Sequence, residues 1–194
     1  MSLENPIVCL GDSLTWGFPY GPMHSWVHLV GERYRLNLIN HGINGNCTED
    51  MLNRFERDVV SAKPTHVIIM GGTNDILMRE SFPRITLNLE QIVEKSLKWN
   101  IQPIIGLPIP LGWKEPEVRL ARIRNWITTY ATQKNLKVID FTQGFYRITA
   151  QGERELRWEL MLDGSHPSVE GYVSMADQFE PEVLGLICDR SIDN

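Results

Sequence analysis

The strongest constraint on the fold is an alternation of short apolar runs with longer segments of helical spacing. The apolar runs lie at 6–10, 36–40, 66–70, 101–107 and 136–141. The intervening segments at 22–34, 48–61, 84–99 and 116–134, and a last one from 168, repeat apolar residues every three or four positions. Buried strands that alternate with helices are typical of an α/β domain with a parallel sheet, and right-handed crossovers place the helices on both faces.

Length and charge narrow the class of protein further. The 194 residues, of which 42% are apolar and 22% charged, fit one folded domain over residues 1–194. A chain of this size buries roughly 70% of its unfolded surface and needs no disulfide or metal to hold it together. The net charge of -5 comes without a basic stripe, so we expect no nucleic-acid partner.

Cysteine usage fits a reducing compartment, and hydropathy gives no sign of a membrane span or a signal peptide. Cys9, Cys47 and Cys188 are too few and too widely spaced for a disulfide framework or a zinc cage. The most apolar stretch, 101–113, contains three prolines, and the first residues lack the pattern of a signal peptide. We therefore expect a cytoplasmic protein with no transmembrane segment, although residues 1–3 leave open that a signal peptide has been removed.

Four polar or glycine-rich motifs come after the predicted strands at 6–10, 36–40, 66–70 and 136–141. These motifs are Gly11-Asp12-Ser13-Leu14, Asn40-x-Gly42-x-x-Gly45, Gly72-x-Asn74-Asp75 and, after a long connection, Asp163-x-x-His166-Pro167. Ligands of open parallel sheets bind outside the carboxyl ends of the strands, so these motifs are expected to meet at one edge. A serine, a histidine, a carboxylate and amide donors are the groups that acyl transfer requires.

Each motif also has an ordinary structural interpretation. Gly11 to Ser13 could form a plain turn that caps the next segment, and Gly45 could be a turn glycine. Asn74 could cap a helix, and His166 could be a surface residue. His24 and His28 are four residues apart on an expected helix, but no third ligand is evident, so we expect no metal. The order of the four motifs, each at a strand end, favours a catalytic site.

The chain resembles the SGNH hydrolases, also called GDSL-type esterases and lipases. The resemblance extends from Gly11 to about Ala176 and depends on the four motifs together with Gly171-Tyr172. Many members have threonine two residues after the glycine that matches Gly45, whereas this chain has Cys47. The resemblance implies a flavodoxin-like three-layer α/β/α sandwich with five parallel strands in the order 2-1-3-4-5. It also implies hydrolysis of esters or thioesters without a metal or another cofactor.

Roles follow for the individual residues. Ser13 is the expected nucleophile, His166 the base that takes its proton, and Asp163 the carboxylate that orients the imidazole. The resemblance assigns the oxyanion hole to the backbone N–H groups of Ser13 and Gly45 and to the side-chain amide of Asn74. Beside these groups, Asp12 and Asp75 either hold the loops in place or serve as ordinary turn residues.

Specificity is expected to come from loops at the same sheet edge. Apolar residues of these loops are candidates for the walls of an acyl pocket, unless they only pack the loops together: Trp16, Ile76, Trp113, Trp158 and Leu162. The segment 153–161 is expected to contain a short helix. We expect a small-molecule ester of short or medium acyl length, with thioesters and lysophospholipids included. A carbohydrate acetylesterase and a non-catalytic binding module are the alternatives, and the sequence does not indicate the oligomeric state.

Overall fold

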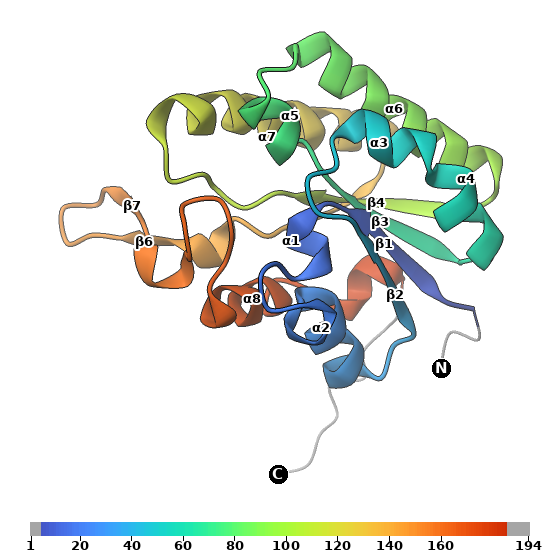
Figure 1. Cartoon of the computed structure of the whole chain (residues 1–194), viewed down its shortest axis with the longest axis horizontal. Helices are drawn as coiled ribbons and strands as arrows, with labels where there is room; N and C mark the ends of the chain where they lie inside the picture. The colour runs from blue at the N-terminus through green and yellow to red at the C-terminus, as the bar shows by residue number, and fades with distance from the viewer. Residues whose placement is uncertain (1–4, 186–194) are drawn as a thin grey trace.

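Five parallel strands form one sheet in the computed structural model, which describes residues 5–185. The strands are β1 (Ile7–Gly11), β2 (Leu38–Gly42), β3 (His66–Met70), β4 (Gln102–Leu107) and β5 (Lys137–Asp140). Their spatial order is β2-β1-β3-β4-β5 (Figure 1). The predicted α/β fold and strand order are therefore confirmed. Cys188 lies outside the described residues.

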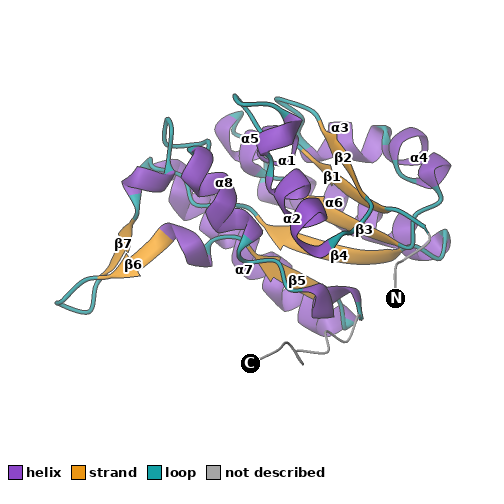
Figure 2. Cartoon of the chain, turned by 90° about the horizontal axis from the view of Figure 1, so that it is seen from below, coloured by secondary structure: helices purple, strands orange, loops and turns teal. Residues whose placement is uncertain are grey.

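Helices cover both faces of the sheet, as Figure 2 shows. They are α1 (Ser13–Trp16), α2 (Trp26–Tyr34), α3 (Thr48–Asn53), α4 (Phe55–Asp58), α5 (Thr73–Leu77), α6 (Phe82–Lys98), α7 (Lys114–Lys134) and α8 (Val169–Ala176). Short 3-10 segments lie at Pro22–His24, Val60–Ala62, Gln143–Phe145, Trp158–Leu160 and Pro181–Leu184. α2 and α8 contribute to one hydrophobic cluster, and α3, α4, α6 and α7 contribute to the other.

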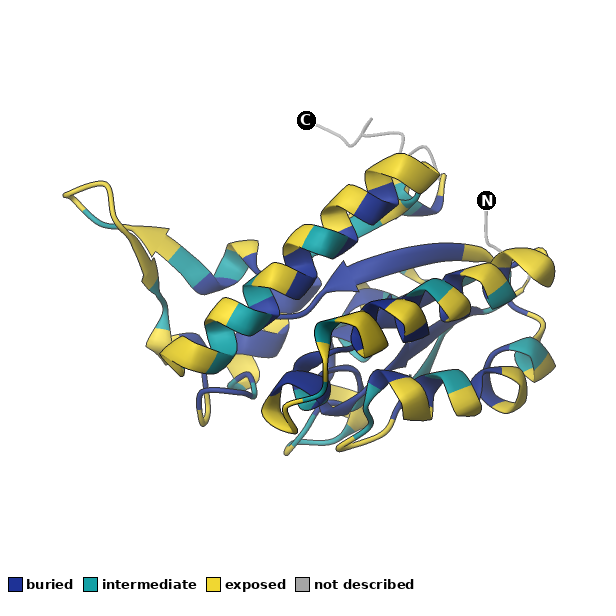
Figure 3. Cartoon of the chain, turned by 90° about the horizontal axis from the view of Figure 1, so that it is seen from above, coloured by how far each residue is buried: buried dark blue, intermediate teal, exposed yellow. Residues whose placement is uncertain are grey.

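The central strands β1 and β3 are almost wholly apolar and buried because both faces of the sheet are covered, whereas the edge strands β2 and β5 carry partly exposed polar residues. Successive side chains of a strand point to opposite faces, so Ile7 and Cys9 join the cluster under α2 and α8. Val8 and Leu10 join the cluster under α6 and α7 instead. Figure 3 shows the central strands mostly buried and the outer helices alternating between buried and exposed turns. This burial on both faces explains why the strands read as apolar runs rather than alternating patterns.

Pro103 lies inside β4 without breaking the sheet. It is opposite Val67 of β3, whereas the pairing of β4 with β5 starts one residue later, at Ile104 and Lys137. A missing backbone N–H is tolerated where a strand has no partner on one side. The prediction of a strand over 101–107 is therefore close to the observed β4.

Two expected helices are interrupted. The pattern over 48–61 predicted one helix, but the chain forms α3, α4 and a 3-10 turn, with Arg54 at the junction in a non-helical conformation. The pattern over 22–34 predicted a helix from Pro22, whereas α2 begins at Trp26. Ser25 interrupts the helix because its side chain accepts a hydrogen bond from the His28 N–H and caps α2.

The expected helix within 153–161 is wrong for most of its length. Two short strands, β6 (Tyr146–Ile148) and β7 (Arg154–Leu156), form an antiparallel hairpin that extends from the body of the molecule (Figure 2). Only Trp158–Leu160 is helical, as a 3-10 turn. The hairpin is favoured by the turn at Gly152, whose φ is +79°, and by the cross-strand ion pair of Arg147 and Glu155.

Gly42 marks a close crossing of backbones at the end of β2. A Cβ at this position would lie 2.2 Å from the Trp16 backbone nitrogen and 2.8 Å from the Asp12 carbonyl oxygen. Asn40 supports the crossing, because its side-chain amide donates to the Thr15 carbonyl at 2.8 Å. The motif Asn40-x-Gly42 therefore seats α1 against β2.

Replacing Gly42 by alanine should destabilise the fold. Because backbone atoms cannot move aside easily, we expect a loss of at least about 2 kcal/mol in the free energy of unfolding, measured by urea denaturation. Gly31→Ala in α2 is the control, since its Cβ would be 3.3 Å from the nearest atom outside the helix, the Leu36 carbonyl oxygen. That variant should change stability by less than about 1 kcal/mol. Equal effects of the two substitutions would contradict the role of the crossing.

Candidate active site

Ser13 lies at the carboxyl end of β1, as the first residue of α1. The preceding Asp12 caps this helix by accepting a hydrogen bond from the Leu14 N–H at 2.9 Å. The Tyr172 hydroxyl of α8 donates to the Phe18 carbonyl at 2.9 Å and so fixes the chain beyond α1. Ser13 is only 6% exposed, and a nucleophile at this place is held by both neighbouring segments.

Ser13, His166 and Asp163 form a continuous hydrogen-bonded chain. The Ser13 Oγ lies 3.1 Å from the His166 Nε2, and the His166 Nδ1 lies 2.8 Å from the Asp163 Oδ2. The Leu162 N–H donates to the His166 carbonyl at 2.8 Å, which closes the loop that carries both residues. Two motifs far apart in the sequence are thus brought together, the first with Ser13 and the last with both Asp163 and His166.

The Asp163 carboxylate is stabilised in its charged form. Burial alone would raise its pKa, but hydrogen bonds from the His166 ring and from the Ser165 and His166 backbone lower the pKa to about 2. An ionised carboxylate only accepts hydrogen bonds, so the His166 Nδ1 carries the proton. The Nε2 is then free to accept the Ser13 hydroxyl proton, as a general base must.

Potential donors for an oxyanion lie beside Ser13. Within residues 5–185, the backbone N–H groups of Ser13 and Gly45 make no hydrogen bond inside the chain. The Asn74 side-chain amide donates one N–H to the Asn46 carbonyl at 3.0 Å, and its second N–H is left for another acceptor. No atom of the described residues lies within 4 Å of the place that a Cβ on Gly45 would take, so its φ of +78°, rather than crowding, favours glycine there.

Asp75 ties the helix that carries Asn74 to the start of α3. Its carboxylate accepts hydrogen bonds from the Thr48 hydroxyl at 2.6 Å and the Thr48 N–H at 3.0 Å, and it is 1% exposed. The Thr48 hydroxyl oxygen accepts in turn from the Asn88 amide at 3.0 Å. The contacts of Asp75 therefore join the loop after β2 to the loop after β3.

Among the five residues predicted to line an acyl pocket, four are at least partly exposed and one is buried in the core. Trp113 and Trp158 are 46% and 55% exposed, and their rings lie against Gly164 and Gly112, next to the loop that carries His166. Leu162 on that loop is also exposed, and Trp16 is half-buried. Ile76 is 3% exposed and packs in the hydrophobic cluster under α6 and α7. It is therefore placed as a core residue.

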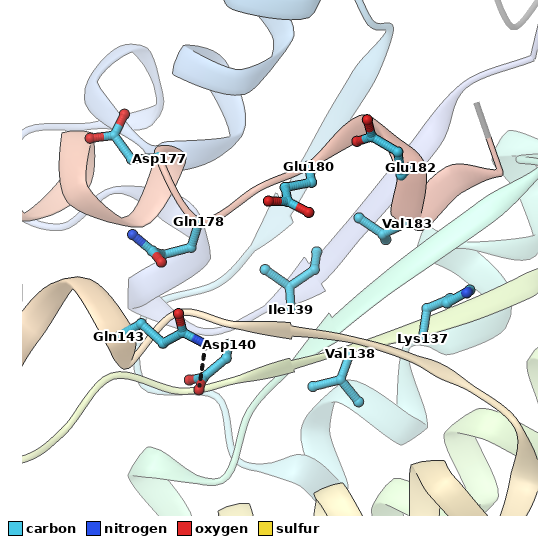
Figure 4. Close-up of a pocket in the computed structure, with 10 residues that line it drawn as sticks. All are labelled: Lys137, Val138, Ile139, Asp140, Gln143, Asp177, Gln178, Glu180, Glu182 and Val183. Carbon is cyan, nitrogen blue, oxygen red and sulfur yellow. Dashed lines mark hydrogen bonds between the residues drawn. The ribbon is translucent and has the colours of Figure 1, made fainter. Parts of the chain in front are cut away.

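A cavity of about 390 Å³ lies away from these residues (Figure 4). It is bounded by the edge strand β5 and by side chains of the segment 177–183, and none of the candidate catalytic residues lines it. Within the described part of the chain, no group of three His, Cys, Asp or Glu residues is arranged to hold a metal ion. Among residues 5–185, no helix combines the length and apolar character needed to cross a bilayer.

The contacts of two residues in the site, Phe18 and Arg54, were not predicted from the sequence. Phe18 packs against the His166 ring, with the ring centres 4.6 Å apart. Arg54 contacts both the end of β1 and the turn at Asn46. Arg54 could have been noticed as a charge three residues after Met51 on a face that is otherwise apolar. Phe18 was recognisable only as an apolar residue of the loop after Ser13, without any sign of its contact with His166.

The model of the GDSL-like lipase/acylhydrolase family matches residues 9–173, and the chain therefore belongs to this family of hydrolases. It is 37% identical over 118 residues to the uncharacterized lipoprotein YqeF of Bacillus subtilis, over 54% of this chain and 49% of that protein. This chain thus spans about half of that relative's length. It is 25% identical over 162 residues to an acetylxylan esterase of Geobacillus stearothermophilus, over 76% of this chain and 72% of that one.

The solved structures agree with the fold. A protein assigned to the G-D-S-L lipolytic family from Desulfitobacterium hafniense has a TM-score of 0.80 and 29% identity, covering 90% of this chain and 97% of that one. The family resemblance predicted from the four motifs is therefore confirmed, and the chain is an enzyme of the GDSL esterase and lipase type.

Ionisation of Asp12 should make stability depend on pH. Burial raises its pKa to about 7, above the value near 4 of an unfolded chain, and its Oδ2 has no partner within the described residues. The folded state therefore keeps a proton that the unfolded state loses, and this carboxyl lowers stability as pH rises from about 4 to about 7.

Asp12→Asn keeps an acceptor for the Leu14 N–H but cannot ionise. Urea denaturation from pH 4 to pH 8 should show the variant gaining stability relative to the wild type as pH rises. Parallel stability curves would show that Asp12 does not titrate in this range.

Proposed function

We propose that the protein is a serine esterase that hydrolyses carboxylic esters through an acyl-enzyme on Ser13. The observation that carries the proposal is the chain of hydrogen bonds from Ser13 through His166 to Asp163, beside the backbone N–H groups of Ser13 and Gly45, which have no partner among the described residues. Family membership supports the same chemistry. The substrate is a small-molecule ester, and no metal or cofactor is needed for this mechanism.

The reaction begins when the Ser13 oxygen attacks the acyl carbon and the His166 Nε2 takes the hydroxyl proton. The carbonyl oxygen becomes an oxyanion and accepts hydrogen bonds from Ser13, Gly45 and the Asn74 amide. Collapse of this intermediate breaks the bond to the leaving alcohol or thiol, which receives the proton from His166. A water molecule then attacks the acyl-enzyme with the same proton transfers and releases the acid.

The exposed apolar residues beside the catalytic loop favour short or medium acyl chains. Trp113, Trp158 and Leu162 present apolar surface next to His166, and Trp16 follows the nucleophile. We leave Ile76 out of this pocket because it is buried in the core. Thioesters and lysophospholipids present the same carbonyl chemistry and belong to the proposed substrate range.

A carbohydrate acetylesterase is the second candidate. The acetylxylan esterase relative supports it, and the exposed faces of Trp113 and Trp158 could stack on a sugar ring. A non-catalytic binding module is disfavoured, because the His166 ring lies within hydrogen-bonding distance of Ser13 on one side and of Asp163 on the other. A cytoplasmic location stays a prediction, since a similar protein of Bacillus subtilis is a lipoprotein.

Two substitutions test the assignment of the site. Ser13→Ala should abolish hydrolysis of p-nitrophenyl acetate, and intact-mass spectrometry should show that a fluorophosphonate probe modifies only the wild type. Asn74→Ala should lower kcat by roughly 100- to 1000-fold, since it removes one oxyanion donor. Full ester turnover by Asn74→Ala would refute the oxyanion assignment, and an unlabelled wild type would favour the binding module.

Substrate preference separates the two esterase candidates. We expect kcat/KM for p-nitrophenyl butyrate to exceed that for acetylated xylo-oligosaccharides, and Trp158→Ala should raise KM about tenfold for the better substrate by removing apolar contact. Trp99→Ala is the matched control, since Trp99 is 52% exposed and follows α6. Higher kcat/KM for the acetylated sugars would establish the carbohydrate esterase instead.

A further inference from the structure

Arg54 joins three separate segments of the chain at one buried guanidinium. Its Nη2 donates to the Gly11 carbonyl at 2.8 Å, and its Nε donates to the Asn46 Oδ1 at 2.7 Å. Its Nη1 forms an ion pair with Asp58 at 2.7 Å. The residue is only 7% exposed, so its bonds are shielded from water.

Two of these segments carry the proposed oxyanion donors. Gly11 ends β1 and is followed by Asp12 and Ser13, whose backbone N–H is the first donor. Asn46 directly follows Gly45, and its carbonyl accepts the hydrogen bond from the Asn74 amide at 3.0 Å. The Arg54 side chain therefore contacts the backbone near the Ser13 donor and the side chain of Asn46, which follows the Gly45 donor. Asn46 in turn positions the third donor, the Asn74 amide.

The chemistry of arginine suits this arrangement. A guanidinium presents several N–H donors in one rigid plane and can bind separate acceptors in fixed directions, whereas the lysine ammonium is a compact charge on a flexible stem. Asp58 supplies the opposite charge that a buried guanidinium needs, and Arg57 holds the same carboxylate from the exposed side. Asp58 thus fixes the guanidinium through its Nη1, and the Nε remains available to donate to Asn46.

We propose that Arg54 is a positioning residue for the oxyanion hole and acts through the Asn46 side chain. This proposal rests on the proposed esterase function. By holding Asn46 in place, Arg54 keeps the Gly45 N–H and the Asn74 amide aimed at the same point. Arg54 is buried and has no role in holding the substrate's acyl chain. Loosening its bond to Asn46 should therefore affect the transition state more than substrate binding.

Asn46→Ala is the decisive variant, because it removes the acceptor of Arg54 and leaves the ion pair with Asp58 in place. We expect kcat for p-nitrophenyl acetate to fall about 10- to 100-fold with KM changed less than about twofold, as for a misaligned catalytic group. Asn46→Asp retains an oxygen acceptor for Arg54 and should restore kcat to within about threefold of the wild type. The midpoint of thermal unfolding should change little in both variants.

Arg54→Lys and Arg57→Lys form a matched pair at the same carboxylate. Lysine at position 54 cannot bond to Gly11, Asn46 and Asp58 at once, so kcat should fall as in Asn46→Ala. Arg57 contacts Asp58 but neither donor-bearing segment, so its lysine variant should keep the wild-type kcat. A boronic acid inhibitor that forms a tetrahedral adduct on Ser13 should bind more weakly to Asn46→Ala by a factor similar to the loss in kcat.

The outcomes separate this proposal from the proposed function. If the wild type hydrolyses the ester and Ser13→Ala does not, the esterase assignment stands whatever happens at position 46. Wild-type kcat in Asn46→Ala, or a loss that Asn46→Asp fails to restore, would then overturn the role of Arg54 alone. A loss confined to KM would also contradict it.

Discussion

The site depends on the parallel pairing of β1 with β2 on one side and β3 on the other. In this register Gly11 is opposite both Gly42 and Met70, so the three strands end at the same level. The segments that follow them must leave the sheet together, and they carry Ser13, Gly45 and Asn74. Hydrogen bonding of the central strands thereby fixes where the groups of the site can meet.

Close packing and hydrogen bonds at this edge of the sheet fix the loops that follow the strands. Gly42 lets α1 cross β2, and the Asn40 amide binds the end of that helix. Asp75 and Arg54 then connect the loop after β2 to the neighbouring loops. Buried carboxyl groups cost desolvation energy: the ion pair with Arg54 compensates Asp58, whereas the hydrogen bond from the Leu14 N–H compensates Asp12 only in part. These buried polar groups thus lower the stability of the fold, and in return they hold donors and acceptors in defined positions.

Much of this arrangement was predictable from the sequence. The strands buried on both faces, such as β3, gave runs of β-branched residues, and the motifs around Ser13 and His166 followed from the strand ends. Hydrophobic spacing could not show the break at Arg54, because one continuous helix and two short helices joined by a single non-helical residue have nearly the same pattern. The hairpin of β6 and β7 was missed because its short strands are mostly exposed and lack apolar alternation.

A crystal structure of the fluorophosphonate adduct would test the central claim most directly. The phosphonyl group should be bonded to the Ser13 Oγ, and its oxygen should accept hydrogen bonds of about 2.7–3.1 Å from the Ser13 N–H, the Gly45 N–H and the Asn74 amide. An adduct whose oxygen points to solvent, or a phosphonyl group on another residue, would contradict the account of how the strand ends build this site.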